Sequence, residues 1–395
     1  MQLSFNELQY VVGTPEIVEE MPNLRVLKPF DDDVIAFLND LSAELRTNRE
    51  YPDVATFGFW CRKSALMQEK AKYDDVSLRF GKGIVFHSTP SNVPVNFAFS
   101  FAAGLLAGNA NIVRLPGKPF EQVSIISDAV KNLLETKHKN MAPYIAFVKF
   151  PPVKEITDAF SSLCNVRVIW GGDMTVSELR QSNIPARTTE ITFADRHSIA
   201  VIDADAYLSA NDKDVIIQDF YNDTYYTDQN ACTSPRIIFW QGKQKNEAKN
   251  DFWNRVHELI KNKYSLAAVQ SVGKLNAMYS VAAKKNVKLE KSEDMLITRI
   301  NIDTVDKDLM NYKYNSGFYF EKDINELKDI VNFCDIRCQT VTYYGVKKED
   351  FSDFLEATRP IGIDRIVPMG KSMDFTLIWD GYDLIRQMSR RVNIL

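Results

Sequence analysis

The stretch GIVFHSTPSNVPVNFAFSFAAGLLAGNANIVRL, residues 83–115, decides the fold. It opens on an apolar strand at residues 83–87 and passes through a turn with two prolines into an apolar helix at residues 95–107. A glycine and an asparagine end this helix, and a second apolar strand follows at residues 111–115. Strands that are apolar on both faces and are joined by a helix are typical of a buried parallel sheet. The stretch therefore predicts a βαβ unit.

The same alternation continues along the chain. Further strands are expected at residues 144–150, 166–170 and 198–203, with helices at residues 119–134, 153–163 and 174–181. Strands and helices that alternate at these lengths predict an α/β fold with a doubly wound parallel sheet. Such sheets bind ligands outside the carboxyl ends of their strands. Before Gly81 the chain is charged and is expected to be helical, and the polar residues 244–250 are expected to form a solvated loop.

The composition excludes several classes of protein. With 45% hydrophobic and 25% charged residues, the 395-residue chain has the composition of a globular protein of about two domains. Its formal net charge of −4 provides no positive field for nucleic acid or anionic lipid. Residues 84–113 carry no formal charge and are long enough to cross a bilayer, but proline, glycine and asparagine interrupt them. We therefore expect no membrane span.

Cysteine and histidine usage bears on redox state and metal binding. The five cysteines are too scattered for a disulfide framework, and the four histidines do not stand near a cysteine pair as zinc ligands do. The first residues show no basic segment followed by an apolar one, so no secretory signal is expected. These observations predict a reduced, cytoplasmic protein that holds no metal ion.

Two turns carry residues suited to chemistry. Asn92 lies between two prolines directly after the first strand, where a rigid turn can present its side-chain amide as an oxyanion donor. The alternative is that Asn92 only caps the helix that follows. Gly171 and Gly172 follow the strand that ends at Trp170, and a strand that leads through glycine into a helix is a common phosphate cradle. The alternative for this pair is a tight turn without a ligand.

Cys232 stands apart from the other cysteines. It is bracketed by small polar residues, and Arg236 follows four positions later, so its thiolate can be stabilised. By contrast, Cys61 lies beside Trp60, and Cys164 lies among apolar residues. The alternative is that Cys232 is one more buried, small hydrophobic side chain, as free cysteines usually are.

Four short patterns follow one another in a characteristic order: Pro90-x-Asn92-x-Pro94, Gly108-Asn109 leading into a strand with Arg114, Gly172 before a helix, and Gln229-x-x-Cys232. In order and rough spacing they resemble the aldehyde dehydrogenase superfamily. The segment DQNACTSPR at residues 228–236, the segment QTV at residues 339–341 and the tail at residues 362–386 resemble one branch most closely. That branch is the acyl-CoA reductase of bacterial bioluminescence, the LuxC-like fatty acid reductase. The likeness covers roughly residues 50–395.

This resemblance implies a role for each pattern. Cys232 would be the nucleophile, and Asn92 with the backbone N–H of Cys232 would hold the oxyanion. The remaining residues would bind a dinucleotide: Ser88, Thr89, Pro90 and Ser91 along its nicotinamide half, Arg114 at the adenine ribose, and Gly171 and Gly172 at the pyrophosphate.

Two departures from the superfamily pattern indicate the direction of the reaction and the cofactor. The segment that holds the general-base glutamate in the superfamily is replaced here by residues 191–196, and the nearby Glu190 is not assigned that role. A missing base weakens hydrolysis of an acyl-enzyme, which an aldehyde oxidiser needs and an acyl reductase does not. An acidic residue is also missing near Gly117 and Lys118, so that Lys118 and Arg114 can accept a 2′-phosphate, which favours NADPH.

We therefore expect an aldehyde-dehydrogenase-like α/β enzyme that uses NADPH to reduce an activated acyl group to an aldehyde through a covalent acyl-Cys232 intermediate. Residues 1–205 are expected to form the cofactor domain, with residues 366–395 returning to it, and residues 206–365 a second α/β domain that carries the nucleophile. The expected partners are an acyl thioester or acyl adenylate substrate, an acyl-activating synthetase, and further copies of the chain in a homo-oligomer. The alternatives are an aldehyde dehydrogenase working in the oxidising direction, an acyl-phosphate or semialdehyde reductase, and a non-catalytic acyl-carrying partner protein.

Overall fold

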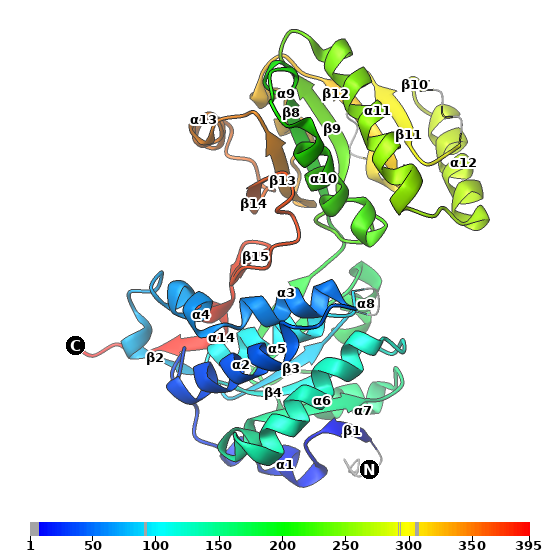
Figure 1. Cartoon of the computed structure of the whole chain (residues 1–395). Helices are drawn as coiled ribbons and strands as arrows, with labels where there is room; N and C mark the ends of the chain where they lie inside the picture. The colour runs from blue at the N-terminus through cyan, green and yellow to red at the C-terminus, as the bar shows by residue number, and fades with distance from the viewer. Residues whose placement is uncertain (1–7, 91–92, 291, 293, 305–307) are drawn as a thin grey trace. The chain divides into compact units, whose positions relative to one another are not determined.

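The computed structural model describes residues 8–90, 93–290, 292, 294–304 and 308–395. The chain divides into two compact units, and the sequence of the second is inserted into that of the first (Figure 1). Unit 1 comprises Met1–Ala194 and Phe375–Leu395, and unit 2 comprises Asp195–Asp374. Each unit is built around one sheet.

The sheet of unit 1 has the strand order β1-β5-β4-β3-β6-β7. Its strands are β1 (Gln9–Val12), β3 (Ile84–Ser88), β4 (Ala110–Arg114), β5 (Ile145–Lys149), β6 (Val166–Trp170) and β7 (Thr189–Phe193). All neighbours are parallel except β1, which runs antiparallel to β5 at the edge. The chain starts the parallel part at β3, adds β4 and β5 on one side, and then adds β6 and β7 on the other. The strand order thus reverses at β3, which is where doubly wound sheets bind ligands.

Helices cover both faces of this sheet. One face, which includes Val85 and Val113, packs against α2 (Asp32–Leu45), α5 (Asn96–Leu106) and α6 (Glu121–Thr136). The other face, which includes Ile84 and Phe86, packs against α1 (Pro15–Glu20) and α7 (Lys154–Leu163). Unit 1 also contains the helices α3 (Pro52–Trp60), α4 (Lys63–Lys70) and α8 (Asp173–Leu179). Alternate side chains of each strand point to opposite faces, so both must be apolar.

The uncharged stretch at residues 84–113 lies in the middle of this unit. The predicted strand, helix and strand are confirmed as β3, α5 and β4, and nine of the eleven α5 residues are buried. The stretch is apolar because helices and sheet cover it. Across the residues that the structure describes, no helix is long and apolar enough to cross a membrane.

The C-terminal segment completes unit 1. Its helix α14 (Leu384–Met388) packs against α5, and β17 (Ser389–Arg391) pairs antiparallel with β2 (Arg79–Gly81). Figure 1 shows this segment, in red, beside the blue and cyan elements of the unit. A short hairpin of β15 (Ile378–Trp379) and β16 (Tyr382–Asp383) precedes α14.

Unit 2 is built around a seven-stranded sheet of order β10-β11-β12-β9-β8-β13-β14. Its strands are β8 (His197–Asp203), β9 (Pro235–Gln241), β10 (Val287–Leu289), β11 (Thr298–Ile302), β12 (Phe318–Asp323), β13 (Cys338–Tyr344) and β14 (Arg365–Pro368). All neighbours are parallel except β10, an antiparallel edge strand. Apolar side chains of α9 (Ala204–Leu208), α10 (Lys213–Asp223) and α11 (Lys245–Lys263) pack on one face, and those of α12 (Ala268–Ala282) and α13 (Lys348–Thr358) on the other.

Three sequence expectations differ from the structure. Residues 198–203 were expected in the first sheet, but β8 pairs with β9 and β13 in unit 2, and β7 is the last parallel strand of unit 1. The units accordingly divide at residues 194/195 instead of 205, and the return begins at residue 375 instead of 366, because β14 pairs with β13. The expected loop at residues 244–250 is the start of α11, whose Ala248 is buried.

Candidate active site

The carboxyl ends of three neighbouring strands bring several predicted residues together in unit 1. Ser88 ends β3 and pairs in register with Arg114 at the end of β4 and with Ile169 of β6. The next residue, Thr89, donates from its hydroxyl to the backbone oxygen of Arg114 at 2.5 Å. The strand order reverses at β3, so this is the edge at which doubly wound sheets bind dinucleotides. Gly171 follows β6 at the same edge.

Two of the predicted site residues, Ser91 and Asn92, lie outside the described residues. Pro90, directly before them, is half-buried.

A buried polar network beneath this edge was missed by the sequence analysis. The ring of His87 lies 2.8 Å from both Ser100 Oγ and Asn111 Oδ1, and Trp170 Nε1 donates to Ser100 Oγ at 3.0 Å. Since Asn111 Nδ2 donates to the backbone oxygen of Asn109, its Oδ1 accepts, and His87 carries its proton on Nε2. Burial lowers the pKa of His87 to about 4, so the ring is neutral at pH 7. The network ties β3, β4, β6 and α5 together.

Arg114 is held at the end of β4 by an aromatic ring. Its guanidinium lies 4.6 Å from the ring centroid of Phe150, and Nη2 is 3.4 Å from the Phe150 backbone oxygen. Burial lowers the pKa of Arg114 from its ordinary value, but the side chain stays charged at neutral pH. Lys118, four residues later, is exposed. One cationic side chain thus ends β4, and a second lies just beyond it.

The two glycines after β6 differ in what surrounds them. A Cβ on Gly171 would come within 2.9 Å of Thr175 Cγ2, so Gly171 allows the first turn of α8 to approach closely. A Cβ on Gly172 would meet no atom within 4 Å, and Gly172 stands at the N-cap of α8. The space beside Gly172 is therefore open.

Cys232 is exposed, whereas the other four cysteines are buried, and all five lie in the part of the chain that the structure describes. Burial raises the pKa of Cys61, and it raises that of Cys164 to about 12. A hydrogen bond with Cys334 and burial raise the pKa of Cys338. A nucleophilic cysteine must be an accessible thiolate, which favours Cys232 among them.

The loop that carries Cys232 joins α10 to β9 and is fixed by a buried glutamine. Gln229 is fully buried, and its Oε1 accepts from the backbone N–H groups of Gly317 and Phe318 at 2.8 and 3.0 Å. Its Nε2 donates to the backbone oxygens of Pro235 and Phe318 at 3.2 and 3.4 Å. One amide thereby joins the loop to the amino ends of β9 and β12.

The backbone of this loop is strained three and four residues before Cys232. Asp228 and Gln229 both adopt left-handed conformations, with φ of 52° and 53°. Two such residues in succession persist only where their surroundings hold them, and such strain gathers at functional sites. Beyond Cys232, Ser198 donates from Oγ to the Cys232 backbone oxygen at 2.7 Å.

A buried positive charge lies under the loop. Arg236 donates from Nη1 to the backbone oxygen of Tyr314 at 2.7 Å and from Nη2 to that of Gln229. Burial lowers the pKa of Arg236 to about 10, while Tyr319 and Cys232 act in the opposite direction. The side chain is therefore cationic at neutral pH.

The tail motif that supported the resemblance contacts this loop. Thr233 donates from Oγ1 to Met373 Sδ at 3.2 Å. Asp223 accepts from the backbone N–H groups of Gly370 and Ser372 at 2.7 and 3.0 Å, and burial raises its pKa to about 6. These hydrogen bonds hold residues 370–373 beside Thr233, the residue that follows Cys232.

Glu190 is held in ion pairs. Its carboxylate accepts from Arg167 Nε at 2.9 Å and from Arg180 Nε at 2.7 Å. Both arginines counter the effect of burial and lower its pKa. A carboxylate bound by two guanidinium groups is a poor proton acceptor, consistent with leaving Glu190 without a base role.

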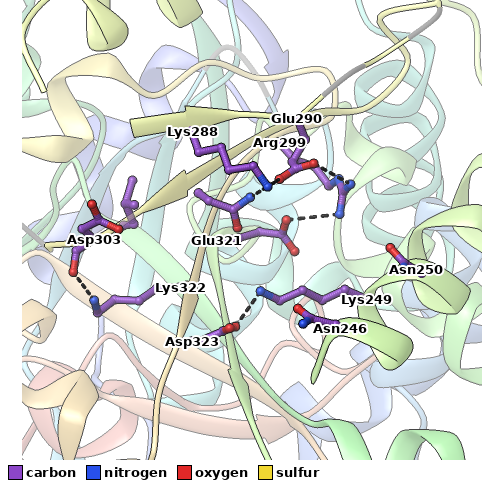
Figure 2. Close-up of a pocket in the computed structure, with 12 residues that line it drawn as sticks. Asn246, Lys249, Asn250, Lys288, Glu290, Arg299, Asp303, Glu321, Lys322 and Asp323 are labelled. Atoms are coloured by element: carbon purple, nitrogen blue, oxygen red, sulfur yellow. Dashed lines mark hydrogen bonds and ion pairs between the residues drawn. The ribbon is translucent and has the colours of Figure 1, made fainter. Parts of the chain in front are cut away.

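A polar cavity of about 490 Å³ opens elsewhere in unit 2 (Figure 2). It lies at the carboxyl ends of β11 and β12, whereas Cys232 precedes the amino end of the parallel strand β9. Its cations are already bound, through the pairs Lys249–Asp323, Lys288–Glu290 and Arg299–Glu321 and a bond from Lys322 to the backbone of Asp303. No predicted site residue lines it.

Among the described residues, no three histidine, cysteine, aspartate or glutamate side chains lie together in a group that could hold a metal ion.

Solved structures with the same fold include aldehyde dehydrogenases. One is aldehyde dehydrogenase 21 of Physcomitrella patens in complex with succinate, with a TM-score of 0.67 at 13% identity, covering 95% of this chain and 87% of that one. Another is an indole-3-acetaldehyde dehydrogenase in complex with NAD⁺, with a TM-score of 0.63 at 11% identity, covering 95% and 86%. At these identities the likeness establishes the two-unit α/β fold of aldehyde dehydrogenases.

Sequence comparison identifies a narrower group. The long-chain acyl-protein thioester reductase of Vibrio harveyi is 23% identical over 326 residues, which span 80% of this chain and 64% of that protein. This chain therefore matches somewhat less than two thirds of its relative's length. The acyl-CoA reductase (LuxC) family profile matches residues 62–391. Since that match covers most of the chain, the protein belongs to the acyl-CoA reductase (LuxC) family.

Proposed function

We propose that this protein reduces an activated acyl group to an aldehyde, with Cys232 as nucleophile and NADPH as reductant. The observation that carries the proposal is the setting of Cys232, an exposed thiol on a loop that is fixed by buried Gln229 and lies over the cationic Arg236. Membership of the LuxC family and the likeness to a thioester reductase of Vibrio harveyi support an acyl substrate.

The chain's own residues would act first in acyl transfer. Cys232, as a thiolate favoured by Arg236, would attack the acyl carbonyl and form a thioester, and the carrier (coenzyme A, AMP or a carrier protein) would leave. Asn92 and the backbone N–H of Cys232 would donate to the developing oxyanion. After reduction the sulfur would leave the thiohemiacetal as a thiolate, releasing the aldehyde and restoring Cys232.

NADPH, when bound, would supply the hydride that reduces the thioester carbonyl. The residues of unit 1 fit such a group, because the strand order reverses at β3 and the space beside Gly172 is open. Ser88, Thr89, Pro90 and Ser91 would bind its nicotinamide half, and Gly171 and Gly172 the pyrophosphate. Arg114 and Lys118 would bind the 2′-phosphate, because the acidic residue that would bind the ribose hydroxyls in its place is missing near Lys118.

Glu190 supports reduction over the oxidising alternative. Aldehyde oxidation ends in hydrolysis of the acyl-enzyme, which needs a base to activate water. The ion pairs of Glu190 with Arg167 and Arg180 leave it unsuited to that step. The acyl-activating synthetase and the homo-oligomer stay predictions.

The test follows the acyl group by mass spectrometry of the intact protein and of its proteolytic peptides. The full-length protein is incubated with octanoyl-CoA or tetradecanoyl-CoA, first without NADPH and then with it, and aldehyde is measured in parallel. We expect one acyl group on the peptide that contains Cys232, its release as aldehyde when NADPH is added, and neither event in Cys232→Ala. Acylation without aldehyde would favour the acyl-carrying alternative. Normal aldehyde production by Cys232→Ala would refute the proposal.

A further inference from the structure

Lys274 is buried in unit 2, and among the described residues no carboxylate forms an ion pair with its ammonium group. Lys274 of α12 has no exposed surface, and its Nζ donates to the backbone oxygens of Met295 at 2.5 Å and Ser316 at 2.6 Å. The backbone oxygens of Leu296 and Gly317 complete the shell at 3.3 Å each. Transferring a lone ammonium from water into a protein is costly unless polar groups surround it. Four carbonyl dipoles provide that surrounding.

The four carbonyls belong to two turns that lead into neighbouring strands. Met295 and Leu296 precede β11, whereas Ser316 and Gly317 precede β12. Met295 and Ser316 adopt left-handed conformations with φ of 61° and 62°, unusual for residues with a side chain. Lys274 therefore holds two turns whose backbone departs from ordinary conformations.

These turns are joined to the nucleophile loop by direct hydrogen bonds. The oxygen of Gly317 faces Lys274, and its N–H donates to Gln229 Oε1 at 2.8 Å. Gln229 stands three residues before Cys232 in the sequence. Asp228 accepts from Gln270 Nε2 at 2.8 Å, and Gln270 lies one turn before Lys274 on the same face of α12. The helix thus contacts the loop directly through Gln270 and indirectly through Lys274.

Besides Lys274, α12 contacts the core of unit 2 through Ala277, Met278 and Val281. Of its fifteen residues only Lys274 and Val281 are buried, whereas Val269, Val272 and Tyr279 are exposed. Here the buried position nearest to the loop is a cation.

We propose that Lys274 is a positioning residue for Cys232: its ammonium group fixes the turns before β11 and β12, and these fix Gln229 and the loop that presents the thiol. The inference rests on the proposed function, because it assigns a task to Lys274 in the reaction of that same thiol. An ammonium has three N–H donors for the carbonyl shell, whereas a neutral amine has two and turns a lone pair toward an oxygen. Loss of the proton would loosen the loop.

This assignment predicts an unusual pH dependence. Burial lowers the pKa of Lys274 from 10.5 to about 7, while Asp228 and Asp294 act in the opposite direction. Within the described part of the chain, titratable groups near these turns include Tyr225, which donates to the Leu296 oxygen, Tyr264, which donates to Asp228, and His257, which pairs with Asp294. Tyr314 lies against α12, since a Cβ on Gly273 would come within 2.0 Å of its hydroxyl.

Stability and positioning respond to this proton with opposite signs. Between about pH 7 and the ordinary lysine value, the unfolded chain holds one proton more than the folded chain, so the free energy of unfolding rises with pH. Turnover should fall over the same range if the ammonium positions Cys232. A purely structural Lys274 would give the first effect without the second.

The test measures kcat and KM for octanoyl-CoA with saturating NADPH, together with thermal unfolding, from about pH 5.5 to about pH 9. We expect the wild-type kcat to fall above about pH 7 while KM changes little. Lys274→Met should lower kcat at about pH 6 by about ten- to a hundredfold and abolish the alkaline fall. Asp294→Asn removes a charge that raises the pKa of Lys274, and so should move the fall to lower pH. Asp303→Asn, a carboxylate change elsewhere in unit 2, is the matched control and should not move it.

The outcomes separate the two levels of the argument. A wild type that makes no aldehyde would overturn the proposed function and this inference with it. An active wild type whose alkaline fall is unchanged in both Lys274→Met and Asp294→Asn, or a Lys274→Met enzyme with full kcat at about pH 6, would overturn the inference alone. If Lys274→Met does not fold, Asp294→Asn decides, because it leaves the carbonyl shell intact.

Discussion

Replacing Glu190 with glutamine tests whether this carboxylate is structural or catalytic. Glu190 lies on β7 directly opposite Arg167 of β6, whose side chain is 3% exposed. Arg167 Nη1 also donates to the backbone oxygens of Leu179 and Ser182 at 3.0 and 2.8 Å. Glu190→Gln keeps the size of the side chain but leaves this buried guanidinium without its counter-charge. The second partner, Arg180, is 57% exposed.

The structure sets the magnitude. Removing one partner of a buried ion pair costs about 3–5 kcal/mol, whereas an exposed pair contributes about 0–1 kcal/mol. We therefore expect Glu190→Gln to lower the free energy of unfolding of unit 1 by about 3–5 kcal/mol and the control Arg180→Gln by less than about 1 kcal/mol. The bound arginines hold the pKa of Glu190 below its ordinary value despite burial. Its contribution is thus present above the unfolded pKa of about 4.3 and lost as pH falls through the folded pKa.

Hydrogen exchange of the peptides that contain β6 and β7, followed by mass spectrometry at about pH 7, gives the readout. Glu190→Gln should accelerate exchange there by two orders of magnitude or more, since about 1.4 kcal/mol corresponds to a factor of ten. In urea titrations, the difference in the free energy of unfolding between Glu190→Gln and wild type should become smaller at acidic pH, where Glu190 is protonated. A Glu190→Gln enzyme of unchanged stability that loses turnover would refute the reasoning and make Glu190 a catalytic group.

Two further predictions concern cofactor choice and the oxyanion. Arg114→Ala should lower the preference for NADPH over NADH by about ten- to a hundredfold in kcat/KM, because a charge-assisted contact contributes about 1.5–3 kcal/mol; an unchanged ratio would count against the assignment. Asn92→Asp should fold and melt like wild type but lower kcat by about 10²–10³, since it keeps a helix cap and sets a negative charge against the oxyanion. Activity within about tenfold of wild type would make Asn92 a cap only.

The parts of the fold that the sequence predicts well are those with local signals. The apolar runs at β3, β4, β5 and β6 and the helices between them are recognisable because each strand is buried on both faces and each helix ends at turn-forming residues. Cys232 is recognisable for a related reason, because polar neighbours and Arg236 mark it as different from cysteines set among apolar residues.

The parts that fail depend on partners far away in the sequence. The apolar run of β8 is like those of unit 1, and nothing within it indicates that β9 and β13, and not β6 and β7, are its neighbours. The polar start of α11 hides the helix, because its buried side chains follow only from Ala248 onward. Lys274 is the extreme case: a lysine is expected in solvent, and its burial requires carbonyls from two distant turns.

The return of residues 375–395 to unit 1 has a consequence for biosynthesis. Leu384, Ile385 and Met388 are buried in the core of unit 1, and Asn109 Nδ2 donates to the backbone oxygen of Met388 at 3.0 Å. These residues leave the ribosome only after all of unit 2 has been made. Unit 2 can therefore fold while unit 1 still lacks part of its core. Until the C-terminal segment is made, apolar surface on α5 in the nascent unit 1 stays uncovered. Chaperones that bind exposed apolar segments would bind the incompletely synthesised unit 1 at this surface.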